Sequence, residues 1–183
     1  MKKLQFITKE LGFDYGHRVC KHGSRCYNPH GHRGSVEITY SFNEIDDDLG
    51  YAIDFGEIKR LCGTWIDDKI DHAFLSNPTD EATINYVMSL DAKLYLMSLN
   101  GAGYCNPSAE NISKELFLTC DYLINDSNLV LHSIKFYETP SSFVTCYKDS
   151  INDEEEENFL LCRQEELENF MSKMGTLSYK QDE

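Results

Sequence analysis

The sequence lacks any apolar run that approaches the roughly 18 residues of a membrane span. Its opening residues, MKKLQFITKE, contain only a four-residue semi-apolar stretch before Thr8, which is too short for the core of a secretory signal peptide. The seven cysteines are odd in number and have no framework spacing, so they do not predict a disulfide scaffold. We therefore expect a cytoplasmic protein with reduced thiols.

Positive charge is also scarce in this chain. The 17 Lys and Arg residues stand against 31 Asp and Glu, giving a formal net charge of -14 and a pI near 4.7. Such a balance argues against binding to nucleic acid or to an anionic membrane through bulk charge. With 183 residues, 41% of them hydrophobic, the chain can bury a core of its own.

Three regions of the chain have the pattern of strands. Residues 35–42 alternate strictly between apolar and polar side chains, which predicts a half-buried antiparallel strand. Residues 4–19 predict an earlier strand region, broken at Gly12 and Gly16. Two further strands are expected near the end of the domain, over residues 129–138 and 143–148.

Helical patterns fill the middle of the chain, which makes the fold class α+β. Apolar residues recur at helical spacing over residues 55–70, 77–99 and 106–123. These elements form one domain over residues 1–150. Residues 151–183 are acidic and amphipathic, and we expect a C-terminal extension that packs on the domain or on a neighbouring subunit.

Histidines gather in residues 17–33, HRVCKHGSRCYNPHGHR. His30 and His32 fall on the same side of an extended segment, because strand side chains alternate faces. A hairpin-like return would bring His17 beside them. Three imidazoles with an open fourth position are typical of a catalytic zinc site. Cys26 is close enough in sequence to be either the fourth ligand or a base beside the metal.

The same stretch is a basic island. It contains four of the six histidines and no Asp or Glu. The positively charged side chains of this stretch favour the binding of an anionic ligand at one place. The competing interpretation is a solvated loop in which the histidines occur by chance. The positively charged side chains are Arg18, Lys21, Arg25 and Arg33.

Two acidic positions are weaker candidates on spacing alone. Asp71 and His72 are adjacent, and an Asp beside a His can hold the imidazole for proton transfer, but adjacent side chains need not touch. Glu138 stands at the end of a predicted strand, where the ordinary interpretation is an exposed strand-end residue.

Six separated motifs, in order, resemble the 6-pyruvoyltetrahydropterin synthase superfamily. They are FDYGHR at 13–18, CYNPHGH at 26–32, GYAIDF at 50–55, DHAFL at 71–75, NPSAENI at 106–112 and ET at 138–139. The resemblance implies a T-fold: a four-stranded antiparallel sheet with helices on one face, which forms a barrel by oligomerising into trimers and hexamers.

The resemblance also implies a role for each site residue. His17, His30 and His32 would bind zinc, and Cys26 would be the general base. Asp71 and His72 would form a second proton-transfer pair, and Glu138, followed by Thr139, would bind the pterin edge. The implied substrate is 7,8-dihydroneopterin triphosphate, whose triphosphate we expect at Arg18, Lys21 or Arg25.

The spacing Cys-x3-His is similar to that of the 6-carboxytetrahydropterin synthase type, which acts in 7-deazaguanine biosynthesis and releases acetaldehyde and triphosphate. The pyruvoyl type usually has five intervening residues. Two alternatives stay open: the pyruvoyl-type reaction, and a non-catalytic module in which Cys26 closes a structural zinc site. One departure concerns residues 14–16, Asp-Tyr-Gly, where many relatives have small residues; it predicts a reshaped pocket wall.

Overall fold

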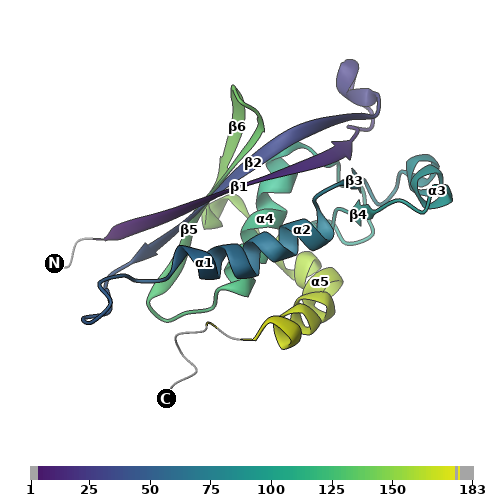
Figure 1. Ribbon diagram of the computed structural model, residues 1–183. Coiled ribbons are helices and arrows are strands. Elements are labelled where there is room, and N and C mark those ends of the chain that lie inside the picture. Colours follow the sequence, from purple (N-terminus) through teal and green to yellow (C-terminus); the bar gives the residue numbers. More distant parts are fainter. Residues whose placement is uncertain (1–3, 176, 178–183) are drawn as a thin grey trace.

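The computed structural model describes residues 4–175 and residue 177. A curled sheet carries the fold, with strand order β4-β3-β1-β2-β5-β6 (Figure 1). The strands are β1 Gln5–His17, β2 His30–Phe42, β3 Ala73–Ser76, β4 Leu94–Leu96, β5 Leu129–Thr139 and β6 Ser142–Cys146. The helices are α1 Phe55–Ile58, the π-helical turn η2 Lys59–Gly63, α2 Thr64–Lys69, α3 Glu81–Ser89, α4 Ala109–Leu123 and α5 Asp153–Met174, with short 3-10 turns η1 Arg25–Tyr27 and η3 Lys148–Ser150.

A long hairpin of β1 and β2 forms the centre of the sheet. Its antiparallel register runs without interruption from Gln5 opposite Phe42 to His17 opposite His30. The predicted break at Gly12 and Gly16 is therefore wrong, because the ladder with β2 pairs both glycines and keeps β1 extended. The alternating strand is confirmed, since the inward side chains of β2 are fully buried. They are Val36, Ile38 and Tyr40.

The sheet has six strands, so the expected four-stranded antiparallel sheet is only part of it. β1, β2, β5 and β6 pair antiparallel, as predicted, but β3 and β4 add two parallel strands at the free edge of β1. The edge of β1 that faces away from β2 has backbone groups available for hydrogen bonding, and β3 pairs with them.

The predicted helix over residues 77–99 is largely wrong, and only α3 is helical there. Asp80 caps its start by accepting a hydrogen bond from the Thr83 amide at 3.4 Å, and Asp91, with φ of 52°, follows its end. Residues 94–96 instead form β4, which places Tyr95 in the core with its hydroxyl on Glu115.

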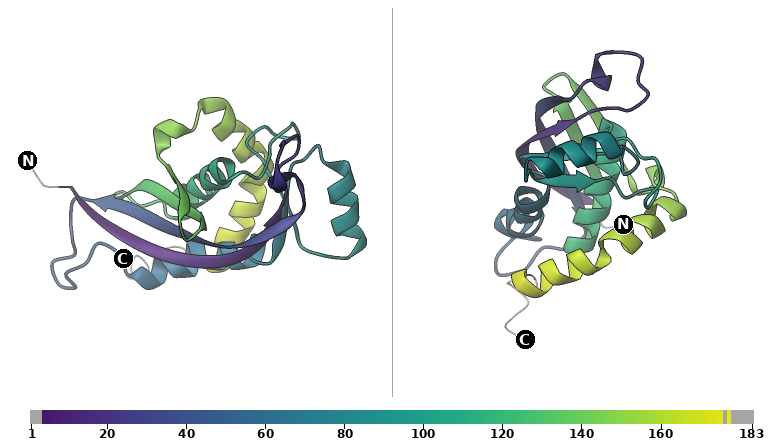
Figure 2. Two further views of the ribbon diagram at one scale, coloured as in Figure 1. Left: turned by 90° about the horizontal axis from the view of Figure 1, so that it is seen from above. Right: turned by 90° about the vertical axis from the view of Figure 1, so that its right-hand side faces the viewer.

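The α1–η2–α2 segment and α4 cover the same face of the sheet. Tyr40 on β2 shows this, because its hydroxyl donates to the Cys120 carbonyl of α4 at 2.8 Å and lies 3.8 Å from Cys62 Sγ of η2. The apolar stripe predicted for residues 55–70 is buried except at Phe55, which is 51% exposed. The left view of Figure 2 shows how strongly the hairpin of β1 and β2 curls.

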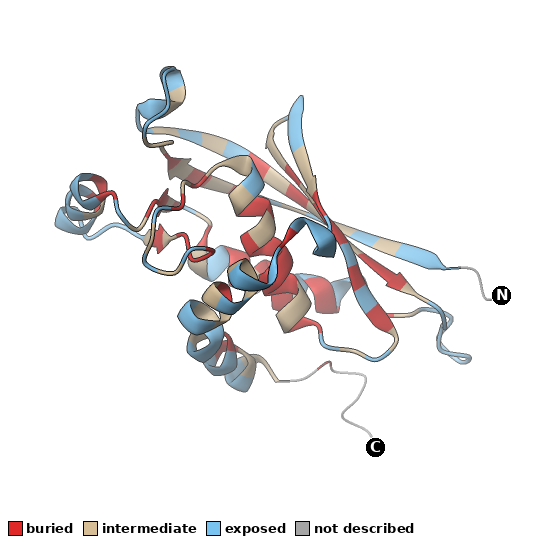
Figure 3. Cartoon of the chain, turned by 180° about the vertical axis from the view of Figure 1, so that it is seen from behind, coloured by how far each residue is buried: buried red, intermediate tan, exposed pale blue. Residues whose placement is uncertain are grey.

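Helix α5 packs on the helical layer. Lys114 of α4 forms an ion pair with Glu155 at 2.6 Å, and the rings of Trp65 and Phe170 meet edge to face at 5.3 Å. Phe159 is completely buried. In Figure 3 buried residues concentrate along β5 and α4, whereas the N-terminal part of β1 is exposed. No helix among the described residues is long and apolar enough to cross a membrane.

Replacing Phe159 with Ala should destabilise the protein by about 3–5 kcal/mol, because a fully buried ring leaves a cavity between α5 and the helices above it. Leu161→Ala on the same helix is the matched control, since Leu161 is 77% exposed, and its effect should stay within about 0.5 kcal/mol. Urea unfolding measures both. Equal effects would mean that α5 is not an integral layer of the fold.

Candidate metal centre

The hairpin brings three imidazoles together where β1 ends and β2 begins. His17 lies opposite His30 in the ladder, and Tyr15 lies opposite His32, so all four side chains share the inward face. One ring nitrogen from each of the three histidines lies within 4.8 Å of the other two. We call His17, His30 and His32 the triad.

Backbone carbonyls decide which nitrogens of the triad point inward. His17 Nδ1 is 2.7 Å from the Pro107 carbonyl oxygen, and His30 Nδ1 is 2.8 Å from that of Asn28. A carbonyl only accepts hydrogen bonds, so each Nδ1 carries a proton and each Nε2 presents a lone pair. The two Nε2 atoms are 3.1 Å apart. Facing lone pairs repel one another, and a cation between them would relieve that repulsion.

The third imidazole strengthens this interpretation. His32 Nε2 is buried and has no hydrogen-bond partner among the described residues. It lies 3.8 Å from Glu138 Oε1, which is also 3.7 Å from His17 Nε2. Ligands of a tetrahedral zinc ion with bonds of about 2.0–2.1 Å to nitrogen lie about 3.4 Å apart. The donor set of the triad therefore fits zinc, with one position left for another ligand.

The surroundings of His17 and His32 favour the neutral form of these two imidazoles. Burial lowers the pKa of His17 to about 4, and the neighbouring His30 and His32 contribute to this shift against the hydrogen bond to Pro107. Burial likewise lowers the pKa of His32, against the opposing effect of the Glu138 carboxylate. A neutral imidazole is the form that binds a metal, so the lowered pKa values of His17 and His32 favour metal binding at neutral pH.

A side-chain clamp holds the Pro107 carbonyl beside His17. The Asn106 amide accepts from the Cys20 backbone amide at 2.9 Å and donates to the Cys20 carbonyl at 3.0 Å. Asn77 in turn donates to Asn106 at 3.3 Å. The sequence identified Asn106 and Pro107 only as a helix start, although Ser108 is the residue that caps α4.

Cys26 lies in the turn η1, half-buried, outside the triad. Its carbonyl accepts from the Val19 amide at 2.8 Å, which ties the turn to the chain leaving β1. Its thiol does not belong to the group of ligand atoms within 4.8 Å of one another. Among the described residues the geometry therefore does not close a tetrahedral site of three histidines and one cysteine.

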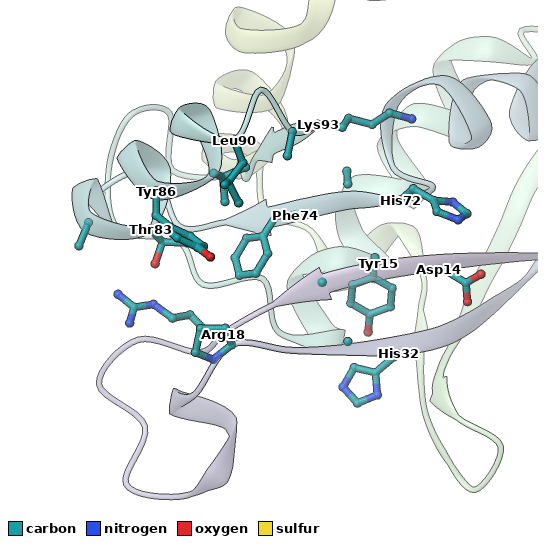
Figure 4. A pocket seen from close by; sticks show the side chains of 17 residues that line it. Asp14, Tyr15, Arg18, His32, His72, Phe74, Thr83, Tyr86, Leu90 and Lys93 are labelled. Carbon is teal, nitrogen blue, oxygen red and sulfur yellow. The ribbon is translucent and has the colours of Figure 1, made fainter.

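Asp71 and His72 do touch, but away from the triad. Asp71 Oδ2 is 2.7 Å from His72 Nδ1, and Asp71 Oδ1 accepts from the Asp14 amide at 2.7 Å. Burial raises the pKa of the Asp71 carboxyl, but these two hydrogen bonds outweigh it, and the pKa lies below its usual range. His72 has φ of 59° and lines a cavity of about 720 Å³ between the strands and α3 (Figure 4).

The predicted phosphate-binding cations differ in their surroundings. Arg18 forms a double hydrogen bond with Asp80 at 2.6 and 2.5 Å, and this guanidinium holds the pKa of the Asp80 carboxyl well below its usual range. Lys21 lies over the Tyr104 ring at 4.3 Å, and Arg25 is exposed. Thr139 follows Glu138 at the end of β5, opposite Ser142.

Comparison with known proteins gives one family match. The family model described as 6-pyruvoyl tetrahydropterin synthase matches residues 6–149. A 6-carboxy-5,6,7,8-tetrahydropterin synthase from Rickettsia conorii is 37% identical over 142 residues, which cover 75% of this chain and 96% of the relative. The Haemophilus influenzae protein of the same name is 32% identical, covering 75% of this chain and 94% of the relative.

Solved structures share the fold at lower identity. An uncharacterized protein from Wolinella succinogenes superposes with a TM-score of 0.67 at 20% identity, covering 80% of this chain and 99% of that one. The 6-pyruvoyl tetrahydropterin synthase of Caenorhabditis elegans gives 0.57 at 16% identity, with 79% and 96% covered.

Metal-free protein should lose stability as the pH falls from about 6.5 toward 4. The folded pKa of His17 is about 4 and its ordinary value is 6.5, so between these values only the unfolded chain binds the proton. The loss should approach about 3 kcal/mol. Urea unfolding of chelator-treated protein across this range measures it.

His17→Asn should flatten this pH dependence, whereas His22→Asn, at an exposed loop histidine, should leave it as in the wild type. Parallel profiles for all three proteins would contradict the assignment of His17 as a buried neutral imidazole.

Proposed function

The chain belongs to the 6-pyruvoyl tetrahydropterin synthase family, and from that premise we propose that it is a zinc-dependent 6-carboxy-5,6,7,8-tetrahydropterin synthase. It would convert 7,8-dihydroneopterin triphosphate to 6-carboxytetrahydropterin, acetaldehyde and triphosphate. The relatives that carry this name at 32–37% identity support the reaction. The observation that carries the zinc assignment is the convergence of three imidazoles. The Nδ1 atoms of His17 and His30 are bound to carbonyl oxygens, and His32 Nε2 has no hydrogen-bond partner among the described residues.

Zinc bound by His17, His30 and His32 would supply a Lewis acid for the oxygens of the substrate side chain. The chain's own residues would do the rest. Glu138 reaches the edge of the triad with its carboxylate, which supports a role in holding the pterin ring of a ligand whose side chain lies at the triad. Thr139 follows it in the chain.

Proton transfer would fall to two groups. Cys26, in the turn that joins the two metal-binding strands, would remove a proton from the substrate side chain. Asp71 and His72 would form the second group, and their 2.7 Å hydrogen bond supports a common function. The Asp71 carboxylate would hold the imidazole in one orientation for proton transfer.

A second copy of the chain would complete the site. Within one chain Asp71 and His72 lie apart from the triad, which supports sites formed between subunits of a trimer or hexamer. Apolar side chains on the uncovered sheet face support the same assembly: Phe6 is 50% and Val130 is 64% exposed. Subunit contact would cover them.

The triphosphate would be held by the basic island. Lys21 and Arg25 are the stronger candidates, because the charge of Arg18 is already matched by Asp80. Arg18 would then act mainly by fixing the loop against α3. In a chain whose formal net charge is -14, this island is the region to which an anionic substrate would be drawn.

The remaining assignments concern the chain as a whole. The family match ends at residue 149, which supports a catalytic domain over residues 1–150 and an acidic extension over residues 151–183. All seven cysteines are free thiols, which supports a reducing, cytoplasmic environment. We place the product in 7-deazaguanine biosynthesis.

Incubation of zinc-loaded protein with 7,8-dihydroneopterin triphosphate tests the proposal by mass spectrometry of the products. The wild type should form 6-carboxytetrahydropterin and acetaldehyde. Cys26→Ala should lower turnover by about 100-fold or more, the usual effect of removing a general base, without loss of zinc. Cys162→Ala, at an exposed cysteine of α5, should behave as the wild type.

The other possible outcomes of this experiment would indicate a different function for the chain. Pyruvoyltetrahydropterin as product would indicate the sister activity of the family. Unreacted substrate, together with loss of zinc and of stability in Cys26→Ala, would indicate a structural zinc module and would refute the proposal.

A further inference from the structure

A buried phenol lies beside the triad without a hydrogen bond. Tyr15 is 3% exposed, and its hydroxyl has no hydrogen-bond partner among the described residues. Its ring centroid lies 5.2 Å from that of His17 and 5.6 Å from that of His32. In Figure 4 the Tyr15 hydroxyl points toward the His32 ring. In the described part of the chain, His32 Nε2 is another buried atom without a hydrogen-bond partner.

Other core tyrosines satisfy their hydroxyls. Tyr40 donates to the Cys120 carbonyl at 2.8 Å, and Tyr95 donates to Glu115 at 2.8 Å. Buried hydroxyls in proteins are generally paired, because an unpaired one forfeits its bonds to water without compensation. Tyr15 is the exception, and it stands at the metal centre.

The surroundings of the ring are shaped to keep it there. A Cβ atom at Gly34 would lie 3.1 Å from Tyr15 Cε1, so glycine at that position leaves the space that the ring occupies. Phe136 and Phe13 pack on the ring at 5.9 and 5.7 Å between centroids. The ring is therefore held in one place, with its hydroxyl oxygen on the side of the triad.

We propose that the Tyr15 hydroxyl donates a hydrogen bond to the ligand oxygen that occupies the open position of the triad. This inference rests on the proposed function and names a further binding residue of that site. The ligand class is a pterin whose side chain carries hydroxyl groups. The neutral Tyr15 hydroxyl would favour a ligand that places an oxygen, and not a carbon, at the open position. The hydrogen bond would strengthen if that oxygen gained negative charge during the reaction.

The test compares Tyr15→Phe with Tyr40→Phe, two changes that each remove one buried hydroxyl. Calorimetry measures the binding of two probes to zinc-loaded protein: neopterin, which has a trihydroxypropyl side chain, and pterin, which has none. Tyr15→Phe should weaken neopterin binding by about five- to tenfold, the value of one hydrogen bond, and leave pterin binding unchanged.

Stability without ligand gives the second readout. Tyr15→Phe should unfold at the same temperature as the wild type or higher, because no bond is lost. Tyr40→Phe should unfold at a lower temperature, because it loses the bond to Cys120, and should bind neopterin as the wild type does. Zinc content should be equal in all three proteins.

The outcomes separate the two claims. If the wild type prefers neopterin over pterin and Tyr15→Phe keeps that preference in full, the inference about Tyr15 is wrong and the proposed function stands. If Tyr15→Phe lowers the unfolding temperature as Tyr40→Phe does, its hydroxyl is structural and the inference is also wrong. If the wild type itself shows no preference and forms no product, the proposed function fails.

Discussion

Two backbone carbonyls, those of Pro107 and Asn28, set the chemistry of this protein. Each accepts the Nδ1 proton of one imidazole and thereby turns the Nε2 lone pair of His17 or His30 toward the same point. Without these bonds either ring could rotate or change tautomer, and the convergence of the triad would be lost. The Pro107 carbonyl is held by the start of α4 and by the Asn106 clamp. The helical layer therefore takes part in orienting the His17 imidazole of β1.

The core supplies the rigidity that such a site needs. The triad stands at the end of a continuous hairpin of two thirteen-residue strands, whose inward face is sealed by α4 and η2 around Tyr40. Three features at this one place cost stability: the facing lone pairs of His17 and His30, and the His32 nitrogen and Tyr15 hydroxyl, which have no hydrogen-bond partner among the described residues. Such costs persist only where the surrounding packing is strong enough to hold the groups together, and they are typical of a site built for a ligand.

Much of this could be predicted from the sequence. Local periodicity of the side chains predicts three features: the strand over residues 35–42, the helix over residues 106–123, and the placement of His30 and His32 on one face of a strand. The secondary-structure predictions failed where pairing with a strand distant in the sequence outweighed local propensity. Gly12 and Gly16 break a strand by propensity but not within a ladder, and residues 94–96 became a strand because the edge of β3 was available.

The parts of the site that the sequence did not reveal were of two kinds. A carbonyl such as that of Pro107 carries no side-chain signature, so its role is visible only in three dimensions. Asp71 and His72 were predicted to form a second proton-transfer pair; they do form a hydrogen bond with one another, but within one chain they belong to a group separate from the triad, just before β3. The proposal for Tyr15 depends on the observation that its hydroxyl has no hydrogen-bond partner within the described part of the chain.

X-ray absorption spectroscopy of the zinc-loaded protein tests the central claim most directly, because it counts the ligand atoms around the metal. We expect three imidazole nitrogens and one oxygen at about 2.0–2.1 Å, with the oxygen replaced or perturbed when neopterin binds. A sulfur ligand at about 2.3 Å would contradict this expectation, since the site would then be closed by a cysteine and have no position for substrate.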